Sequence, residues 1–260
     1  LNRGNFQPGS GAIDTFAGVV AELEAMATRG SVEEAYQRLE ADEVMLRLDP
    51  AVWPTKATGA TLSVAERDGL QRIDRVVRLG RVLRIEADRI VLEQGEAPTS
   101  PDHLHVHCAA RGLPLVPPEP VFADEAITLQ CVSRMHPTLS AAITGYVEST
   151  DRTTDEKNWL LPANPYSDTP FDFLRAVLLG LSTELRWSRA PDVQAWLDDS
   201  RLNVLKDVAT SSDLTRLGEL QGRFLEAFFP AMDKLRAQVD TATPAERALV
   251  NEAAFPDDGP

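Results

Sequence analysis

The sequence predicts an α/β protein with a small sheet region within residues 45–132 and a helical region after it. Apolar residues recur at helical spacing before and after the middle of the chain. Short β-rich runs, bounded by turn residues, lie between these helical segments. The composition of 43% apolar and 25% charged residues is typical of folded domains. It excludes disorder, collagen and coiled coil as the main state of the chain.

The N-terminal part of the chain predicts three helices. Apolar residues at helical spacing predict the first over residues 12–29. Ser31 with Glu34, and Ser63 with Glu66, have the spacing of a capping box. They predict helices that run from Ser31 to about residue 40 and from Ser63 to about residues 75–77. Residues 45–48 alternate briefly and predict a strand or a short extended piece.

The middle of the chain predicts four strands. Two β-rich runs at 82–85 and 90–92 predict a hairpin, followed by a loop over residues 95–101. Residues 104–108 and 127–132 predict a third and a fourth strand. Pro137 predicts the start of a helix that runs to about residue 149, because proline is favoured in the first helical turn.

The C-terminal part predicts a helical region over residues 151–240. Three apolar stripes at helical spacing carry this prediction, and Pro191 begins the second of them. Residues 241–260 end in a Pro-Asp-Asp-Gly-Pro sequence, which predicts a flexible acidic tail.

Charge and cysteine content limit the partners and the location. The chain has 26 basic and 40 acidic residues, a net charge of −14. Such a surface repels phosphate backbones and anionic lipids, so we expect neither nucleic acid nor a membrane as a partner. Two cysteines are too few for a disulfide framework, and the chain shows no signal-peptide pattern. These observations predict a cytoplasmic protein.

Sequence motifs for nucleotide or metal chemistry are weak. The chain lacks G-x-G-x-x-G and G-x-x-x-x-G-K-[ST], so nucleotide binding by this chain alone has no support. His103, His105 and His107 alternate along a predicted strand, which would place three imidazoles on one face. Zinc binding in a metal-dependent hydrolase is one reading of this pattern, and a polar strand face is the other. We predict no metal site, because His136 lies on a different element.

One arrangement resembles a known family. The predicted hairpin leads through a Gly/Pro loop to Asp102, to an apolar strand, and to the small residues Ala109, Ala110 and Gly112. It resembles the late part of the flavin- and NAD(P)-binding oxidoreductase fold. Residues 2–9, 46–50, 76–82 and 127–130 are similar to segments of bacterial FAD- or NAD(P)-dependent oxidoreductases.

The resemblance implies a partial Rossmann-like sheet and a set of cofactor-binding residues. Residues 1–150 would form part of a dinucleotide- or flavin-binding domain that lacks the N-terminal glycine fingerprint. Small residues suit a turn that passes close to a pyrophosphate, and the helix that begins at Pro137 would meet the flavin. The implied cofactors are FAD and NAD(P), and the implied binding residues are Ala110, Gly112, Gln130, Ser133, Arg134 and Ser140. The implied family leaves the catalytic residues open.

Three functions therefore stay open. The leading one is the C-terminal part of a FAD- and NAD(P)-dependent oxidoreductase that acts on a small-molecule substrate. The alternatives are a non-catalytic helical binding or scaffolding protein and the metal-dependent hydrolase. A fragment of such an oxidoreductase would leave strands 104–108 and 127–132 without neighbours. We therefore expect either a homodimer or pairing with a missing N-terminal half.

Overall fold

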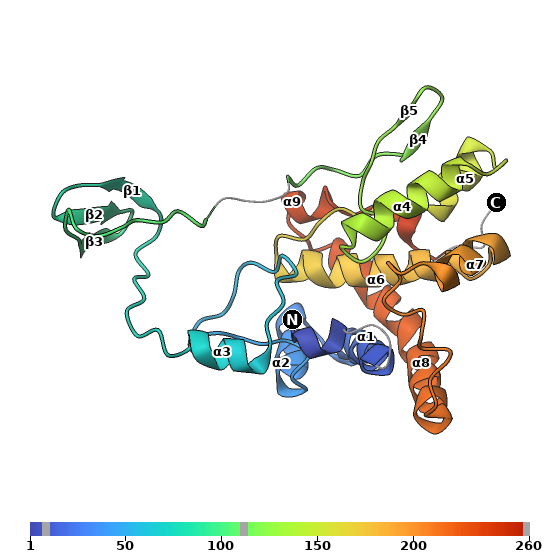
Figure 1. The fold of residues 1–260 in the computed structure, drawn as a ribbon, viewed down its shortest axis with the longest axis horizontal. Helices are drawn as coiled ribbons and strands as arrows, with labels where there is room; N and C mark the ends of the chain where they lie inside the picture. The colour runs from blue at the N-terminus through green and yellow to red at the C-terminus, as the bar shows by residue number, and fades with distance from the viewer. Residues whose placement is uncertain (7–10, 110–113, 257–260) are drawn as a thin grey trace. The chain divides into compact units, whose positions relative to one another are not determined.

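The computed structural model describes residues 1–6, 11–109 and 114–256, and it separates into two units. Unit 1 consists of Leu1–Arg67 and Leu115–Pro260, and unit 2 consists of Asp68–Pro114. Unit 1 is mainly helical, and unit 2 contains a small antiparallel sheet (Figure 1). The predicted mixed α/β class is confirmed.

The helices of unit 1 begin and end as follows: η1 (Arg3–Phe6), α1 (Ala12–Thr28), α2 (Val32–Ala41), α3 (Val64–Leu70, which continues into unit 2), α4 (Pro137–Glu148), α5 (Thr154–Leu160), α6 (Pro170–Trp187), α7 (Pro191–Asp199), α8 (Leu214–Val239), α9 (Pro244–Arg247) and η3 (Glu252–Ala254). The strands are β1 (Val82–Ile85), β2 (Arg89–Leu92) and β3 (Gly95–Pro98) in unit 2, and β4 (Phe122–Ala123) and β5 (Ala126–Ile127) in unit 1.

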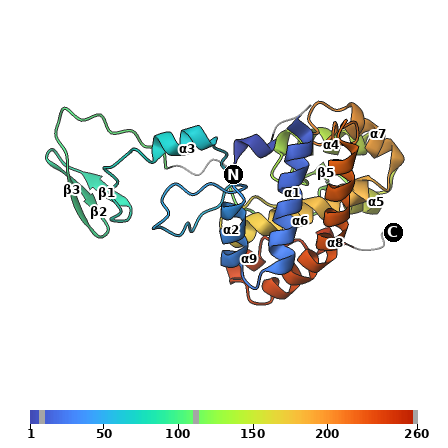
Figure 2. The ribbon, with the colours of Figure 1, turned by 90° about the horizontal axis from the view of Figure 1, so that it is seen from below.

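Helix α6 is the central element of unit 1. Fifteen of its 18 residues are buried, which agrees with a sequence that is apolar around most of the helix. Thr169 begins the helix with a capping box: its side chain accepts from the Asp172 N–H, and Asp172 accepts from the Thr169 N–H. Helices α1, α2 and α8 lie on one side of α6, and α4 and α5 lie on the other (Figures 1 and 2).

Two apolar cores form on these two sides. The larger core joins α1, α2, α6 and α8, with Leu23, Leu39 and Leu178 almost completely buried. The second core joins α4, α5, α7 and the end of α6, with Ile143 and Trp187 at its centre. Most of the apolar residues that the helical periodicity selects are buried in these cores, but Leu214, Leu225 and Phe229 of α8 are between 62% and 72% exposed.

The predicted capping residues begin their helices. Ser31 accepts a hydrogen bond from the Glu34 N–H at 3.2 Å, and Ser63 accepts from the Glu66 N–H at 3.2 Å. The helix after Ser63 nevertheless ends at Leu70, several residues before the predicted end. None of the residues of α3 is buried, so there is no packed face to extend the helix.

The sheet of unit 2 confirms the predicted hairpin and adds one strand. The strand order is β1-β2-β3, and both pairs are antiparallel. β3 lies within residues 95–101, for which the sequence predicts a loop because Gly-Glu-Ala-Pro contains few residues that favour strands. A strand at the edge of a sheet tolerates Pro98, which lacks an N–H group to donate.

Three other strand predictions are wrong. Residues 45–48 and 104–108 form no strand, and Leu104 is 89% exposed. Residues 126–127 alone pair with β4, so the predicted strand 127–132 is present only at its first residue. Alternation favours a strand, but the backbone needs a neighbouring strand to pair with. Both sheets of the described residues are antiparallel, and no parallel Rossmann-like sheet appears among them.

The predicted flexible tail is also wrong up to Pro256. Thr243 begins α9 with a capping box, and its partner Glu246 also accepts a hydrogen bond from Thr169 at 2.9 Å. Arg186 of α6 donates to the carbonyl groups of Ala253 and Phe255. The acidic composition indicated a solvated tail, but these contacts hold the segment against α6.

Candidate functional site

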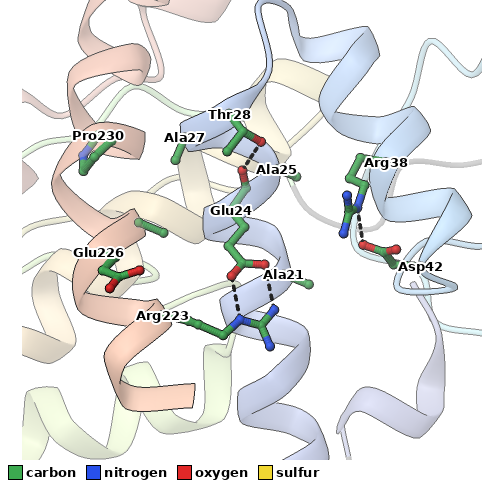
Figure 3. Close-up of a pocket in the computed structure, with 11 residues that line it drawn as sticks. Ala21, Glu24, Ala25, Ala27, Thr28, Arg38, Asp42, Arg223, Glu226 and Pro230 are labelled. Carbon is green, nitrogen blue, oxygen red and sulfur yellow. Dashed lines mark hydrogen bonds and ion pairs between the residues drawn. The ribbon is translucent and has the colours of Figure 1, made fainter. Parts of the chain in front are cut away.

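Two pockets of similar size lie among the described residues of unit 1. The first, called here the α1–α8 groove, has a volume of about 450 Å³ and lies between α1, α2 and α8 (Figure 3). Arg223 donates two hydrogen bonds of 2.7 Å to Glu24, and Arg38 pairs with Asp42. Alanine side chains form much of the remaining wall. Arg223 and Glu24 pair across the groove, and Arg38 and Asp42 pair at the end of α2, so these four charges offer little to a charged ligand.

The second pocket, called here the Arg134 pocket, has a volume of about 400 Å³. Its wall comes from the loop before α4, the end of α6, α7 and residues 203–209. Phe16 of α1 and Gln221 of α8 complete it. Volumes of roughly 300–1,000 Å³ are typical of small-molecule sites. This pocket lies at the predicted junction between residues 127–132 and the helix beginning at Pro137.

Ser140 fixes the loop that carries Arg134. Its hydroxyl oxygen accepts hydrogen bonds from the backbone N–H groups of Val132 and Ser133 and donates to the His136 carbonyl at 2.7 Å. The buried Cys131 thiol donates to the Ser133 carbonyl at 3.1 Å, and burial raises the pKa of this thiol. The Ser140 hydroxyl and the Cys131 thiol thus hydrogen-bond to the loop backbone and are not available to a ligand.

The loop is strained and tightly packed at its centre. Met135 has a φ of 51°, in the left-handed region that non-glycine residues rarely adopt. Arg134 lies directly against Gly180 of α6, where a Cβ atom would stand 2.8 Å from the Arg134 backbone nitrogen. Strained backbone persists where the surrounding structure holds it, and such positions concentrate at binding sites.

Arg134 is the principal charged group of the pocket. Its side chain is 6% exposed, and its Nε lies 3.3 Å from Glu184 Oε1 on α6. Ser133 donates to the same Glu184 oxygen at 3.1 Å. Among the described residues, the Nη1 and Nη2 atoms of Arg134 have no hydrogen-bond partner. A guanidinium group that is almost buried therefore has donors left to meet a ligand.

Glu22 of α1 is a second buried charge near Arg134. Its carboxylate makes no hydrogen bond or ion pair with the described residues, and the residue is 4% exposed. Burial raises the pKa of Glu22 to about 7, although the positive charge of Arg134 acts in the opposite direction. Near neutral pH the Glu22 carboxyl is therefore partly protonated, and Glu184 supplies the firm negative charge beside Arg134.

His136 and Lys206 complete the polar part of the wall. Burial lowers the pKa of His136 to about 4, and the charge of Arg134 adds to this effect, so the imidazole is neutral at pH 7. The Lys206 ammonium forms no ion pair with a described residue. Asp198 accepts a hydrogen bond from Gln194 at 2.7 Å. Arg134 and Lys206 therefore keep unused donors. The two acidic groups of the wall, Glu184 and Asp198, already accept hydrogen bonds.

The structure separates the predicted cofactor-binding residues. Arg134 lines the pocket, Ser133 holds Glu184, and Ser140 holds the loop. Gln130 lies outside the pocket, where its side-chain amide pairs with the backbone of Glu119. Ala110 and Gly112 lie outside the described residues. Three of the six predicted residues, Ser133, Arg134 and Ser140, therefore lie at the predicted junction, and of these Arg134 lines the pocket.

The three histidines do not gather into a ligand set. Thr99 Oγ1 lies 3.1 Å from His103 Nδ1 and 2.8 Å from His105 Nε2, so one hydroxyl occupies a ring nitrogen of each. Within the part of the chain that the structure describes, no three His, Cys, Asp or Glu side chains are placed to hold a metal ion.

The sequence reading missed Glu22, Glu184 and Lys206. A signal was present for Glu22, which interrupts the apolar stripe formed by Val19, Val20 and Leu23. A charged residue on a buried helix face needs a partner or a changed pKa, and it can therefore point to a site. Glu184 and Lys206 gave no comparable signal in the sequence.

Comparisons with known proteins give relatives without a stated activity. No protein-family model matches the chain, and no solved structure matches it. The chain is 35% identical over 246 residues to uncharacterized protein Rv2000 of Mycobacterium tuberculosis and to uncharacterized protein Mb2023 of Mycobacterium bovis. The match covers 94% of this chain and 46% of each relative, so the chain spans about half the length of these proteins.

Proposed function

We propose that unit 1 binds a small organic carboxylate in the Arg134 pocket. The observation that carries this proposal is the almost buried Arg134 guanidinium, whose Nη1 and Nη2 donors are unused among the described residues. Guanidinium groups bind carboxylates through two parallel hydrogen bonds. Lys206 adds a second positive charge to the same wall.

The apolar part of the wall suits the carbon skeleton of such a ligand. Phe16, Trp187 and Leu197 line the pocket opposite a small number of polar groups. This combination of apolar walls with few oriented polar groups is typical of small-molecule sites. Neutral His136 can donate or accept one hydrogen bond without adding charge. The proposed ligand is therefore an aromatic or aliphatic acid and not an inorganic anion.

Flavin- and NAD(P)-dependent oxidation remains a second proposal, and it concerns a longer protein of which this chain would be one part. The resemblance named in the sequence analysis supports it. So does the position of Arg134, which borders a pocket at the predicted cofactor junction. Flavin absorbance in protein purified with the remaining half would test it. This proposal also retains the predicted cytoplasmic location and small-molecule substrate.

Calorimetric titration with phenylacetate tests the carboxylate proposal. Phenylacetamide, which has the same shape without the charge, is the matched control ligand. We expect phenylacetate to bind about tenfold more tightly than phenylacetamide, because hydrogen bonds to a charged acceptor are about twice as strong as neutral ones. Lys206→Ala should weaken phenylacetate binding, and Arg201→Ala on the exposed surface outside the pocket should not.

Two outcomes would contradict the proposal. Equal affinity for the acid and the amide would show that charge plays no part in binding. An equal effect of Lys206→Ala and Arg201→Ala would place the carboxylate outside the Arg134 pocket. Circular dichroism of each variant establishes that it is folded before its affinity is compared.

A further inference from the structure

Unit 2 carries a regular series of arginines. Within residues 72–84, arginine occurs at every third position: Arg72, Arg75, Arg78, Arg81 and Arg84, all of them exposed. Unit 2 as a whole contains seven arginines, no lysine and seven acidic residues. Its net charge is therefore zero, and the net charge of −14 resides entirely in unit 1.

The acidic residues of unit 2 pair with only some of these arginines. Glu86 lies between Arg84 and Arg89, and each N–O distance is 2.6 Å. Glu93 accepts from the backbone N–H of Arg81, which leaves the guanidinium group of Arg81 unused. Among the described residues, the side chains of Arg72, Arg75 and Arg81 form no ion pair or hydrogen bond. Three guanidinium groups are thus free to bind an anionic partner.

Exposed aliphatic side chains lie between the arginines. Ile73, Val76, Val77, Val82 and Leu83 are between 53% and 61% exposed. Unit 2 contains no Phe, Tyr or Trp. Single exposed apolar residues are common on protein surfaces, but a run of five within eleven positions marks a surface that gains from being covered.

A bulge in β1 places the apolar side chains of Val82 and Ile85 on one face of the sheet. The register shifts between Val82, which pairs with Leu92, and Arg84, which pairs with Val91. Leu83 is therefore the extra residue, and Val82 and Ile85 share a face with Ile90 and Leu92. Leu92 is buried, but Val82 and Ile85 are half exposed. β1 is also one of the two edge strands of the sheet, next to free guanidinium groups.

We propose that this surface of unit 2, formed by residues 72–85, docks an acidic segment of a partner protein that also carries aliphatic side chains. Carboxylates of the partner would pair with Arg72, Arg75 and Arg81, and its aliphatic side chains would cover the exposed valines and leucines. Both the charge and the apolar surface of residues 72–85 are then used. The inference is independent of ligand binding in the Arg134 pocket.

Two other occupants fit the surface less well. Single-stranded nucleic acid is bound largely by stacking of bases on aromatic side chains, and unit 2 contains no Phe, Tyr or Trp. A symmetric contact between two copies would place the same arginines against one another and would bring together two chains of charge −14. An acidic protein segment satisfies the arginines without either difficulty.

Fluorescence anisotropy with the full chain and a labelled peptide of alternating glutamate and leucine tests the proposal. A peptide of alternating lysine and leucine is the control ligand. The triple variant Arg72→Glu, Arg75→Glu, Arg81→Glu should weaken binding of the acidic peptide by about tenfold or more, because three favourable charge contacts become repulsive. Arg75→Glu alone should weaken it more than Arg201→Glu, a matched change on unit 1.

A second variant separates a protein partner from a polyanion. Val76→Ser with Val77→Ser leaves every charge in place, and we expect it to weaken binding of the acidic peptide while leaving binding of heparin unchanged. Absence of peptide binding, or equal loss in the Arg75 and Arg201 variants, would overturn the proposal. So would tight binding of polyuridylate that the valine substitutions do not affect, or self-association in light scattering that the triple variant abolishes.

Discussion

Charged side chains meet different surroundings in the two units. In unit 1, Asp172, Arg175 and Arg186 lie inside the core on α6, whereas the arginines of unit 2 share the surface with exposed aliphatic residues. Arg175 is tolerated inside because Asn164 and the carbonyl of Pro165 accept its N–H groups. Unit 2 is too small to build a second layer that could enclose its apolar face. Helices that pack around α6 allow unit 1 to bury paired charges, whereas the single sheet of unit 2 leaves its aliphatic side chains exposed.

The largest expected difference between the units is in the cost of removing an apolar side chain. Phe173→Ala on α6, where the side chain is 1% exposed, should lower the free energy of unfolding by about 4 kcal/mol. Leu83→Ala on β1 should change it by less than about 0.5 kcal/mol. Urea denaturation measures both, followed by the helical circular-dichroism signal for Phe173→Ala and by hydrogen exchange of the β1–β3 amides for Leu83→Ala. Similar losses would mean that Leu83 is covered in the folded chain.

A second prediction concerns the packing of Arg134 on α6. Gly180→Ala should lower the free energy of unfolding by about 3 kcal/mol, because the added Cβ would meet backbone atoms of Arg134 that cannot move freely. Gly145→Ala on α4 is the matched control, since a Cβ there meets no atom within 4 Å. That substitution should be stabilising by about 0.5–1 kcal/mol. Thermal unfolding of both variants decides whether the contact at Gly180 is as tight as described.

The third prediction is a pH dependence that comes from the buried Glu22. Burial raises its pKa from 4.5 to about 7 in the folded chain, so the folded state retains a proton that the unfolded state has released. The contribution of Glu22 to stability is complete below pH 4.5 and is lost as the pH rises through 7. Glu22→Gln stays neutral at every pH. It should therefore match the natural chain at pH 4.5 and exceed its stability by about 2–3 kcal/mol at pH 8.

His136 changes the free energy of unfolding with pH in the opposite direction to Glu22. Comparison of the natural chain with the Glu22→Gln variant cancels this contribution. Its pKa falls from 6.5 to about 4 on burial, so its contribution is complete above pH 6.5 and is lost as the pH falls through 4. Both chains contain His136, so the difference in their unfolding free energies between pH 4.5 and 8 reports Glu22. A difference that does not change with pH would show that Glu22 is solvated.

The smallest expected effect tests the packing of residues 241–256. Thr243→Ala removes the two hydrogen bonds of the Thr243 hydroxyl, which accepts from the Glu246 N–H and donates to the Glu246 carboxylate, and should lower the free energy of unfolding by about 1 kcal/mol. Ser211→Ala, in the segment before α8, is a control outside this region. Hydrogen exchange should show faster exchange of the Glu246 amide in the Thr243 variant. Unchanged exchange would mean that the segment is mobile in both proteins.

Sequence reading succeeded where the cause of structure is local. The helices after Gly11, Ser31 and His136 begin within a residue of the predicted positions, since capping residues and apolar periodicity lie within each segment. The strand predicted at 104–108 failed because no neighbouring segment pairs with it. Alternation of polar and apolar residues is a local property of the segment, whereas a strand also needs a neighbouring strand to pair with.

The same division holds for the Arg134 pocket. The resemblance to flavin-binding oxidoreductases implied Arg134, because this residue lies at the junction before the helix that begins at Pro137. Its partner Glu184 lies 50 positions away on α6, and Glu22 comes from α1. Which charges meet at Arg134 depends on how α1 and α6 pack, and no spacing in the sequence expresses that.

The parallel contact of α1 with α8 has a consequence for synthesis of the chain on the ribosome. The ion pairs Arg216–Asp14 and Arg223–Glu24 join residues that lie 202 and 199 positions apart. The face of α1 that packs against α8 therefore stays exposed until nearly all of unit 1 has been translated. At roughly 5–20 residues per second, that interval is on the order of ten to forty seconds. During it, the nascent chain presents Val19, Leu23 and Met26 to chaperones before α8 can cover them.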